Sequence, residues 1–211
     1  MGLSQRTVSV PASGGVPAFA YSFQVYVGQG YDPAVPAPLV VAGNMGLAPW
    51  RALADAEGLI VLDFRDVDRN GGYTFAEDVL ALDAALGDVE ARWNVDTRRR
   101  YFHGFSAAAH WGYAVVLANA NTFAGLGVNA GSMQFALSTG VWPNNVPRKI
   151  AVAIRHGTAD AVVPYAAATD AQARLQAAQH PVRLSSFAGG HTVSAQDAQE
   201  VWSFLRGFQA P

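Results

Sequence analysis

A serine flanked by small residues follows a short apolar run in segment 101–110, which reads Tyr-Phe-His-Gly-Phe-Ser-Ala-Ala-Ala-His. Gly104 and Ala108 stand two residues before and two residues after Ser106, and an alanine-rich stretch continues the chain. Small residues at these positions allow a strand and the next helix to cross closely, with the serine on the tight turn between them. The pattern predicts that Ser106 is a nucleophile at the end of a strand.

An acid and a base follow this serine along the chain, at Asp160 and His191. Each comes shortly after an apolar run, in the segments His-Gly-Thr-Ala-Asp and Gly-Gly-His-Thr. The carboxyl ends of parallel strands meet at one crevice of a sheet. The chain order serine, aspartate, histidine is that of α/β-hydrolases. We therefore predict a catalytic triad in which His191 moves the proton of Ser106 and Asp160 orients the imidazole.

Hydrolysis through such a triad also needs donors for the developing oxyanion. The N–H of Ala107, directly after the serine, is the first expected donor. The second is expected from the glycine-rich loop after the apolar run 39–41, at the N–H of Asn44 with Met45 as the alternative. Met45 and Trp142 are the predicted substrate-binding side chains, because one adjoins this loop and the other lies in a long irregular segment.

Other titratable residues have simpler interpretations. Asp63 and Asp66 follow a predicted strand and remain alternatives for the triad acid. Asp78 is expected to be structural, in the first turn of a helix. The remaining histidines are expected to be structural or solvated: His103, His110, His156 and His180. No pair of them has a spacing that predicts a metal site, and no cofactor is expected.

The elements that would position these residues alternate along the chain. Strands are expected at 7–10, 19–27, 39–41, 59–62, in the run before Ser106, and at 124–128, 149–154 and 182–187. Helices are expected at 50–57, 75–93, 107–119, 164–179 and 194–207. The arginines at 98–100 are interpreted as a solvated helix end, and 130–147 as irregular. This alternation predicts an α/β fold, with a mainly parallel sheet, antiparallel strands at its N-terminal edge and helices on both faces.

Composition limits the function classes further. The chain has 211 residues, enough for a single catalytic domain spanning 1–211. A net charge of -2 with scattered basic residues does not indicate a nucleic-acid surface. There is no cysteine, no apolar run of membrane-spanning length and no signal peptide, so we expect a soluble protein. Both a cytoplasmic and a secreted location are compatible with this, and the oligomeric state stays open.

Four segments carry a resemblance to a known family. They read RALADAEGLIVLDFRD, WNVDTRRRYFHGFSAAAH, HGTADAVVPY and GGHT. From the run at 39–41 onward the chain resembles bacterial polyhydroxybutyrate-depolymerase-like esterases, a group that includes feruloyl and acetylxylan esterases. The resemblance implies an α/β-hydrolase fold with Asp160 and His191 as triad acid and base. One difference is that the family usually has His-Gly after the first core strand, where this chain has Ala42 and Gly43.

The predicted activity is therefore that of a serine carboxylic-ester hydrolase that forms an acyl-enzyme. Short-chain acyl esters, hydroxyalkanoate oligomers and feruloyl or acetyl sugars are compatible substrates, so the expected partner is a small-molecule or polymeric ester. A peptidase or amidase would use the same triad chemistry. A binding module that has kept the fold without the chemistry is the third alternative.

Overall fold

A single eight-stranded sheet runs through the computed structural model, which describes residues 1–211, with strand order β1-β2-β4-β3-β5-β6-β7-β8. The strands are β1 (Gly2–Val10), β2 (Phe19–Val27), β3 (Ala37–Gly43), β4 (Ile60–Phe64), β5 (Val95–Phe105), β6 (Gly125–Asn129), β7 (Ala151–Gly157) and β8 (Val182–Phe187). β2 is antiparallel to both β1 and β4, and every other neighbouring pair is parallel. The predicted fold class is confirmed, and β2 alone runs against the direction of the other strands.

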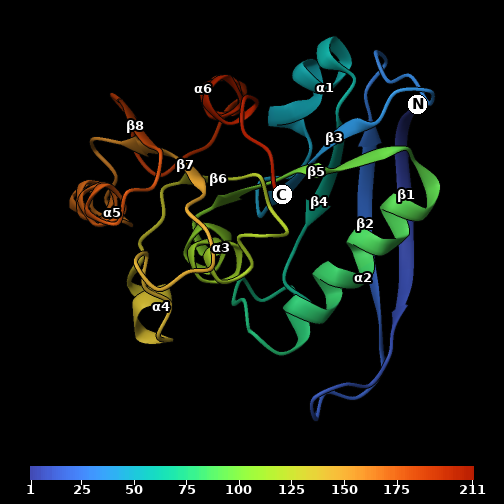
Figure 1. Ribbon diagram of the computed structural model, residues 1–211, viewed down its shortest axis with the longest axis horizontal. Helices are drawn as coiled ribbons and strands as arrows, with labels where there is room; N and C mark the ends of the chain where they lie inside the picture. The colour runs from blue at the N-terminus through green and yellow to red at the C-terminus, as the bar shows by residue number, and fades with distance from the viewer.

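Helices cover both faces of this sheet. They are η1 (Ala48–Trp50), α1 (Arg51–Glu57), α2 (Glu77–Arg92), α3 (Ala107–Ala118), α4 (Gln134–Ser138), α5 (Ala166–Ala177) and α6 (Ala195–Leu205). In Figure 1, α1 and α6 lie on one side of the sheet, and α2, α3 and α5 lie on the other. Each side has its own apolar cluster, of 16 buried residues under α1 and α6 and of 38 under the other three. The sheet is therefore shielded from water on both faces, as parallel strands require.

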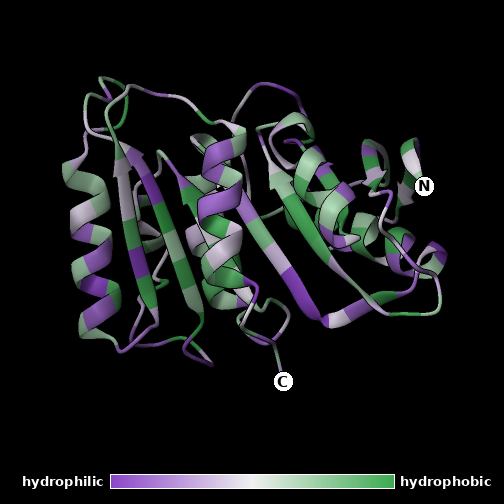
Figure 2. Cartoon of the chain, turned by 90° about the horizontal axis from the view of Figure 1, so that it is seen from above, coloured by the Kyte–Doolittle hydropathy of each residue, from purple (hydrophilic) through white to green (hydrophobic).

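The hydropathy of the chain explains this layering. All seven residues of β3 and all five of β6 are buried. Figure 2 shows that hydrophobic and hydrophilic residues alternate along the helices. In α2 the apolar residues recur at three- and four-residue steps, so Leu82, Leu86 and Val89 are buried along one stripe. No helix combines the length and the apolar character needed to cross a membrane.

Three segments differ from the sequence-based expectation. The first strand, expected at 7–10, begins five residues earlier, at Gly2. The arginines at 98–100 lie inside β5 rather than at a helix end. Arg98 is exposed, Arg99 and Arg100 are partly buried, and Arg100 donates to Glu90 at 2.6 Å. The segment 130–147, expected to be irregular, contains the short helix α4. The prediction failed there because a five-residue helix gives no periodic signal.

His103 is a fully buried residue of β5 whose titration should affect stability. Its Nε2 donates to Asn129 Oδ1 at 2.7 Å, and burial lowers its pKa to about 4. In the unfolded chain the His103 ring takes up a proton with a pKa near 6.5. The contribution of neutral His103 to the free energy of unfolding is therefore fully present above pH 6.5 and is lost as the pH falls toward 4. We expect a loss of about 3 kcal/mol in the free energy of unfolding across this window. Urea titrations at pH 7 and pH 4.5 would measure it, and His103→Gln should remove this part of the pH dependence.

Candidate active site

Ser106 occupies the turn between β5 and α3 in a strained backbone conformation. Its φ of 55° and ψ of -117° lie in a region that L residues rarely adopt. The turn is held because the Ser106 N–H donates to Asn129 O at 3.0 Å, while the Ser106 carbonyl accepts from Ala109 and His110 in the first turn of α3. The hydroxyl is thereby projected beyond the strand end, at the positive end of the α3 dipole.

Gly104 permits the close crossing of β5 and α3. A Cβ at this position would lie 2.5 Å from the carbonyl oxygen of Ala108, which cannot move without distorting the helix. We expect Gly104→Ala to lower the free energy of unfolding by about 2 kcal/mol. Gly87→Ala is the matched control, because Gly87 is exposed in α2 and a Cβ there would meet no atom within 4 Å, so alanine should stabilise slightly. Urea denaturation would compare the two, and equal effects would contradict the explanation.

Asp160 and His191 lie on the loops that follow β7 and β8. His191 Nδ1 is 2.9 Å from Asp160 Oδ2, and His191 Nε2 is 2.8 Å from Ser106 Oγ. The two loops meet at Gly157, where a Cβ would lie 2.3 Å from the carbonyl oxygen of Gly189. The Phe105 ring packs against the imidazole at a centroid distance of 4.9 Å. The three predicted triad residues are thus brought together in one hydrogen-bonded line.

The carboxylate of Asp160 is enclosed, and its side chain has no exposed surface. Burial by itself raises the pKa of Asp160, but hydrogen bonds from the Val163 N–H, from His191 and from the Val162 N–H together hold that pKa below its usual value. His156 supports the same loop, because its Nε2 donates to Val163 O at 2.8 Å. Asp160 therefore stays ionised, and as an acceptor it keeps the proton of neutral His191 on Nδ1. His191 Nε2 then presents its lone pair to Ser106.

The predicted oxyanion donors differ in whether their N–H groups already have a hydrogen-bond partner in the protein. The N–H of Ala107 begins α3 and has no partner in the protein. The N–H of Asn44 is already donated to Phe64 O at 3.0 Å, so it is not available to a substrate. The N–H of the next residue, Met45, has no partner. The Met45 side chain is partly buried and packs against the apolar cluster under α1 and α6, while its backbone N–H is free to contact a ligand.

A hollow of about 270 Å³ adjoins the turn that carries the serine. The loop after β4 contributes residues 71–73, α3 contributes Ala107, His110 and Trp111, and α4 contributes Phe135. Phe135 stacks on Phe75 with ring centroids 5.4 Å apart. Ala107 is also a predicted oxyanion donor, whereas the other lining residues were not predicted as site residues from the sequence. Residues 71–73 and Phe135 come from an irregular loop and a short helix, whose packing against α3 has no periodic signature.

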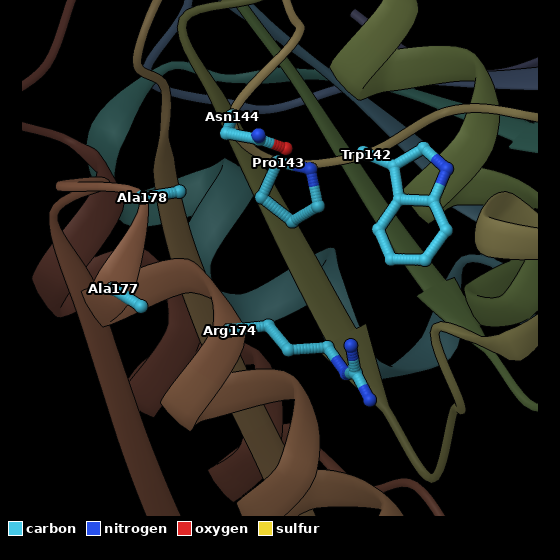
Figure 3. Close-up of a pocket in the computed structure, with 6 residues that line it drawn as sticks. All are labelled: Trp142, Pro143, Asn144, Arg174, Ala177 and Ala178. Carbon is cyan, nitrogen blue, oxygen red and sulfur yellow. The ribbon is translucent and has the colours of Figure 1, made fainter.

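Trp142 lies in a different hollow, of about 290 Å³. Figure 3 shows Trp142, Pro143 and Asn144 opposite Arg174 of α5 and the two alanines at the end of that helix, Ala177 and Ala178. None of the three triad residues lines this hollow, and the prediction that Trp142 binds the substrate is not supported by its location. α5 ends shortly before the N-terminal end of β8, whereas the triad lies at the C-terminal ends of the strands. The hollow beside Trp142 is therefore at the other end of the sheet from the triad.

The alternative acids have other partners. Asp63 forms an ion pair with Arg65 at 3.1 Å. Asp66 accepts the N–H groups of Asn70 and Gly71 at 2.7 and 3.0 Å, and so shapes the loop that borders the hollow beside Ser106. Neither contacts His191, so Asp160 is the acid that the fold brings to the imidazole.

Several known proteins are similar to this chain. The family model of phospholipases and carboxylesterases matches residues 80–208, well over half of the chain. A search of curated protein sequences finds no match. Among solved structures, a thermostable esterase is similar with a TM-score of 0.74 and 16% identity over 98% of this chain and 63% of that one.

Two further solved structures are similar to this chain. An acylaminoacyl peptidase from Pyrococcus horikoshii has a TM-score of 0.68 and 11% identity over 97% of this chain, which spans 40% of the peptidase. A ferulic acid esterase from Anaeromyces mucronatus has a TM-score of 0.63 and 13% identity over 98% of this chain and 90% of its own. At such identities the likeness establishes the α/β-hydrolase fold. The family match over residues 80–208 shows that the chain belongs to the phospholipase/carboxylesterase family.

Proposed function

We propose that the protein is a serine carboxylic-ester hydrolase that forms an acyl-enzyme on Ser106. One observation carries the proposal: the unbroken line of hydrogen bonds from the Ser106 hydroxyl through His191 to the buried Asp160. A serine hydroxyl is a poor nucleophile at neutral pH unless a base removes its proton during attack. The imidazole lone pair 2.8 Å away supplies that base.

In the proposed reaction, Ser106 Oγ forms a bond to the ester carbonyl carbon as its proton passes to His191 Nε2. The carbonyl electrons move onto the oxygen, and they return as the bond to the alcohol oxygen breaks and that oxygen takes the proton. Water then repeats the sequence on the acyl-enzyme and releases the acid. Asp160 stabilises the imidazolium in both halves of the cycle.

The N–H groups of Ala107 and Met45 are the proposed donors to the oxyanion. Neither N–H has a hydrogen-bond partner in the protein. The N–H of Asn44, the other candidate, is instead donated to Phe64 O. Both are backbone groups held by the fold, so they need no rearrangement as charge develops on the substrate oxygen.

We further propose that residues 1–211 form one catalytic domain whose function is of the polyhydroxybutyrate-depolymerase-like and feruloyl-esterase type. The motifs described above support this, as does the near-complete overlap with the ferulic acid esterase structure. The substrate would be a small or polymeric ester.

Detection of the acyl-enzyme tests the proposal. We expect a burst of 4-nitrophenol from 4-nitrophenyl acetate, and a fluorophosphonate adduct that peptide mass spectrometry locates on Ser106. Absence of both ester turnover and the adduct would contradict a catalytic role and favour a binding module. Faster cleavage of 4-nitroacetanilide than of the matched ester would instead assign the protein as an amidase.

A further inference from the structure

Asn44 is the first residue after β3, and its backbone ends that strand. Its φ of 57° lies in the left-handed region, which asparagine adopts more readily than most residues do. The Asn44 N–H donates to Phe64 O of β4 at 3.0 Å, so the predicted role of this N–H as an oxyanion donor passes to Met45. The backbone of Asn44 is thus bonded to the strand on one side of β3, and its side chain is bonded on the other side.

The side-chain amide of Asn44 joins the loop after β3, residues 44–46, to the serine turn, residues 105–107. Asn44 Nδ2 donates to Phe105 O at 3.4 Å. The orientation of the amide follows from its partner, because a carbonyl oxygen can only accept and only the NH₂ end of the amide can donate. No other hydrogen bond connects these two segments.

The direction of the Phe105 carbonyl places it within reach of this amide. The Ser106 N–H, on the opposite side of the same trans peptide, donates to Asn129 O of β6, so Phe105 O points away from β6 and toward β3. Packing brings the two segments close, because a Cβ on Gly43 would lie 2.9 Å from the Cβ of Ala108. The close approach is therefore set by packing, and the Asn44 amide fixes the loop to the turn.

This hydrogen bond lies between the two proposed oxyanion donors. Met45 directly follows Asn44, and Ala107 comes two residues after Phe105. Asn44 and Phe105 are 61 residues apart, so the spacing of the donors depends on contacts between segments rather than on covalent geometry. An oxyanion hole is effective only when each donor lies about 2.7–3.1 Å from the position of the oxyanion. A shift of the loop relative to the turn would weaken one of the two bonds.

We propose that Asn44 is a positioning residue whose side-chain amide sets the spacing between the N–H groups of Met45 and Ala107. The inference rests on the proposed esterase function and adds to it the group that holds the oxyanion hole together. Acylation and deacylation both pass through an oxyanion, so a misplaced donor slows both steps by a similar factor. Loss of the amide therefore lowers kcat and leaves KM nearly unchanged.

Two substitutions remove the amide donor without forbidding the turn. Asn44→Gly keeps the left-handed backbone and deletes the side chain, and Asn44→Asp keeps its shape but presents only oxygens to Phe105 O. For 4-nitrophenyl acetate we expect kcat to fall about tenfold in Asn44→Gly and about thirtyfold in Asn44→Asp, with KM within about twofold of wild type. These losses are smaller than on deleting a donor, because the Met45 N–H is displaced rather than removed.

Gln179→Gly is the matched control. Gln179 also has a left-handed φ, of 63°, but it lies between α5 and β8, at the other end of the sheet from the triad. Glycine relieves the same backbone strain there, so kcat should equal that of wild type. Urea denaturation of all three variants would show that each is folded under the assay conditions.

A trifluoromethyl ketone gives a second measurement that depends on the oxyanion. Ser106 Oγ adds to its carbonyl carbon, His191 takes the hydroxyl proton, and the ketone oxygen becomes a stable oxyanion. We expect the inhibition constant to rise in each Asn44 variant by about the factor by which kcat/KM falls.

Wild-type kcat in Asn44→Gly, or a fall in kcat with an unchanged inhibition constant, would overturn the inference. A loss of activity that accompanies a lower urea midpoint would assign Asn44 a structural role and overturn it as well. Absence of ester hydrolysis by the wild-type protein would instead contradict the esterase function itself.

Discussion

Alanine in place of Ser106 is expected to reduce kcat/KM for 4-nitrophenyl acetate by about 10⁴- to 10⁶-fold. The variant keeps the fold and the backbone donors but has no oxygen to form the acyl-enzyme, so only binding and oxyanion stabilisation remain. Steady-state release of 4-nitrophenol would measure the loss. Thermal unfolding should be almost unchanged, because alanine meets the same strain as serine at a φ of 55°.

Ser9→Ala is a suitable control for this experiment. Ser9 is exposed on β1, which is separated from β5 by three other strands of the sheet, and its hydroxyl has no protein partner. Activity of Ser9→Ala should equal that of wild type. If purified Ser106→Ala retained more than a hundredth of the wild-type rate, another nucleophile would have to be sought.

The second large effect is expected at the triad acid. Asp160→Asn should lower kcat by about 10⁴-fold, with little change in the backbone. The amide oxygen would continue to accept from the N–H groups of Val162 and Val163, which leaves the NH₂ group facing His191 Nδ1. The imidazole would then have to accept at Nδ1 and carry its proton on Nε2. In that tautomer it presents a donor to Ser106 and cannot remove its proton.

Asp63→Asn provides the comparison, because Asp63 was the alternative acid and its carboxylate pairs with Arg65 instead. We expect Asp63→Asn to stay within about threefold of wild type in kcat, since Asp63 contacts none of the triad residues. Steady-state kinetics of both variants on the same ester would decide between the two acids. A larger loss in Asp63→Asn than in Asp160→Asn would reject the assigned triad.

The fold could be predicted from the sequence because its signals are local and repeated. Short apolar runs alternate with amphipathic helices, and each run is long enough to identify a buried strand. The positions of Ser106, Asp160 and His191 follow from the same pattern, since a parallel sheet gathers its strand ends at one edge. The short helix α4 has no such repeat and was missed.

The finer features of the site depend on contacts that no local pattern encodes. Whether Asn44 or Met45 has a free N–H depends on where the pairing of β3 with β4 ends. The last hydrogen bond of this pairing runs from the Asn44 N–H to Phe64 O. The placement of the His110 ring depends on Ser132, which is 22 residues away in the chain. Trp142 lies away from the triad because of the path of its loop, and that path cannot be predicted from the composition of the loop.

A buried ion pair links the two segments that hold the acid and the base. Arg155 of β7 donates to Asp197 of α6 at 2.6 Å, and both side chains are almost fully enclosed. Asp197 also accepts the N–H and hydroxyl of Ser194, closing the start of the helix three residues after His191. Replacing either ion alone would strand a charge in the interior, at about 3–5 kcal/mol. A redesign that exchanged both for apolar residues would avoid that cost but would remove the side chain that caps the start of α6. The stability of the fold and the orientation of the His191 imidazole therefore cannot be changed independently by substitutions at this ion pair.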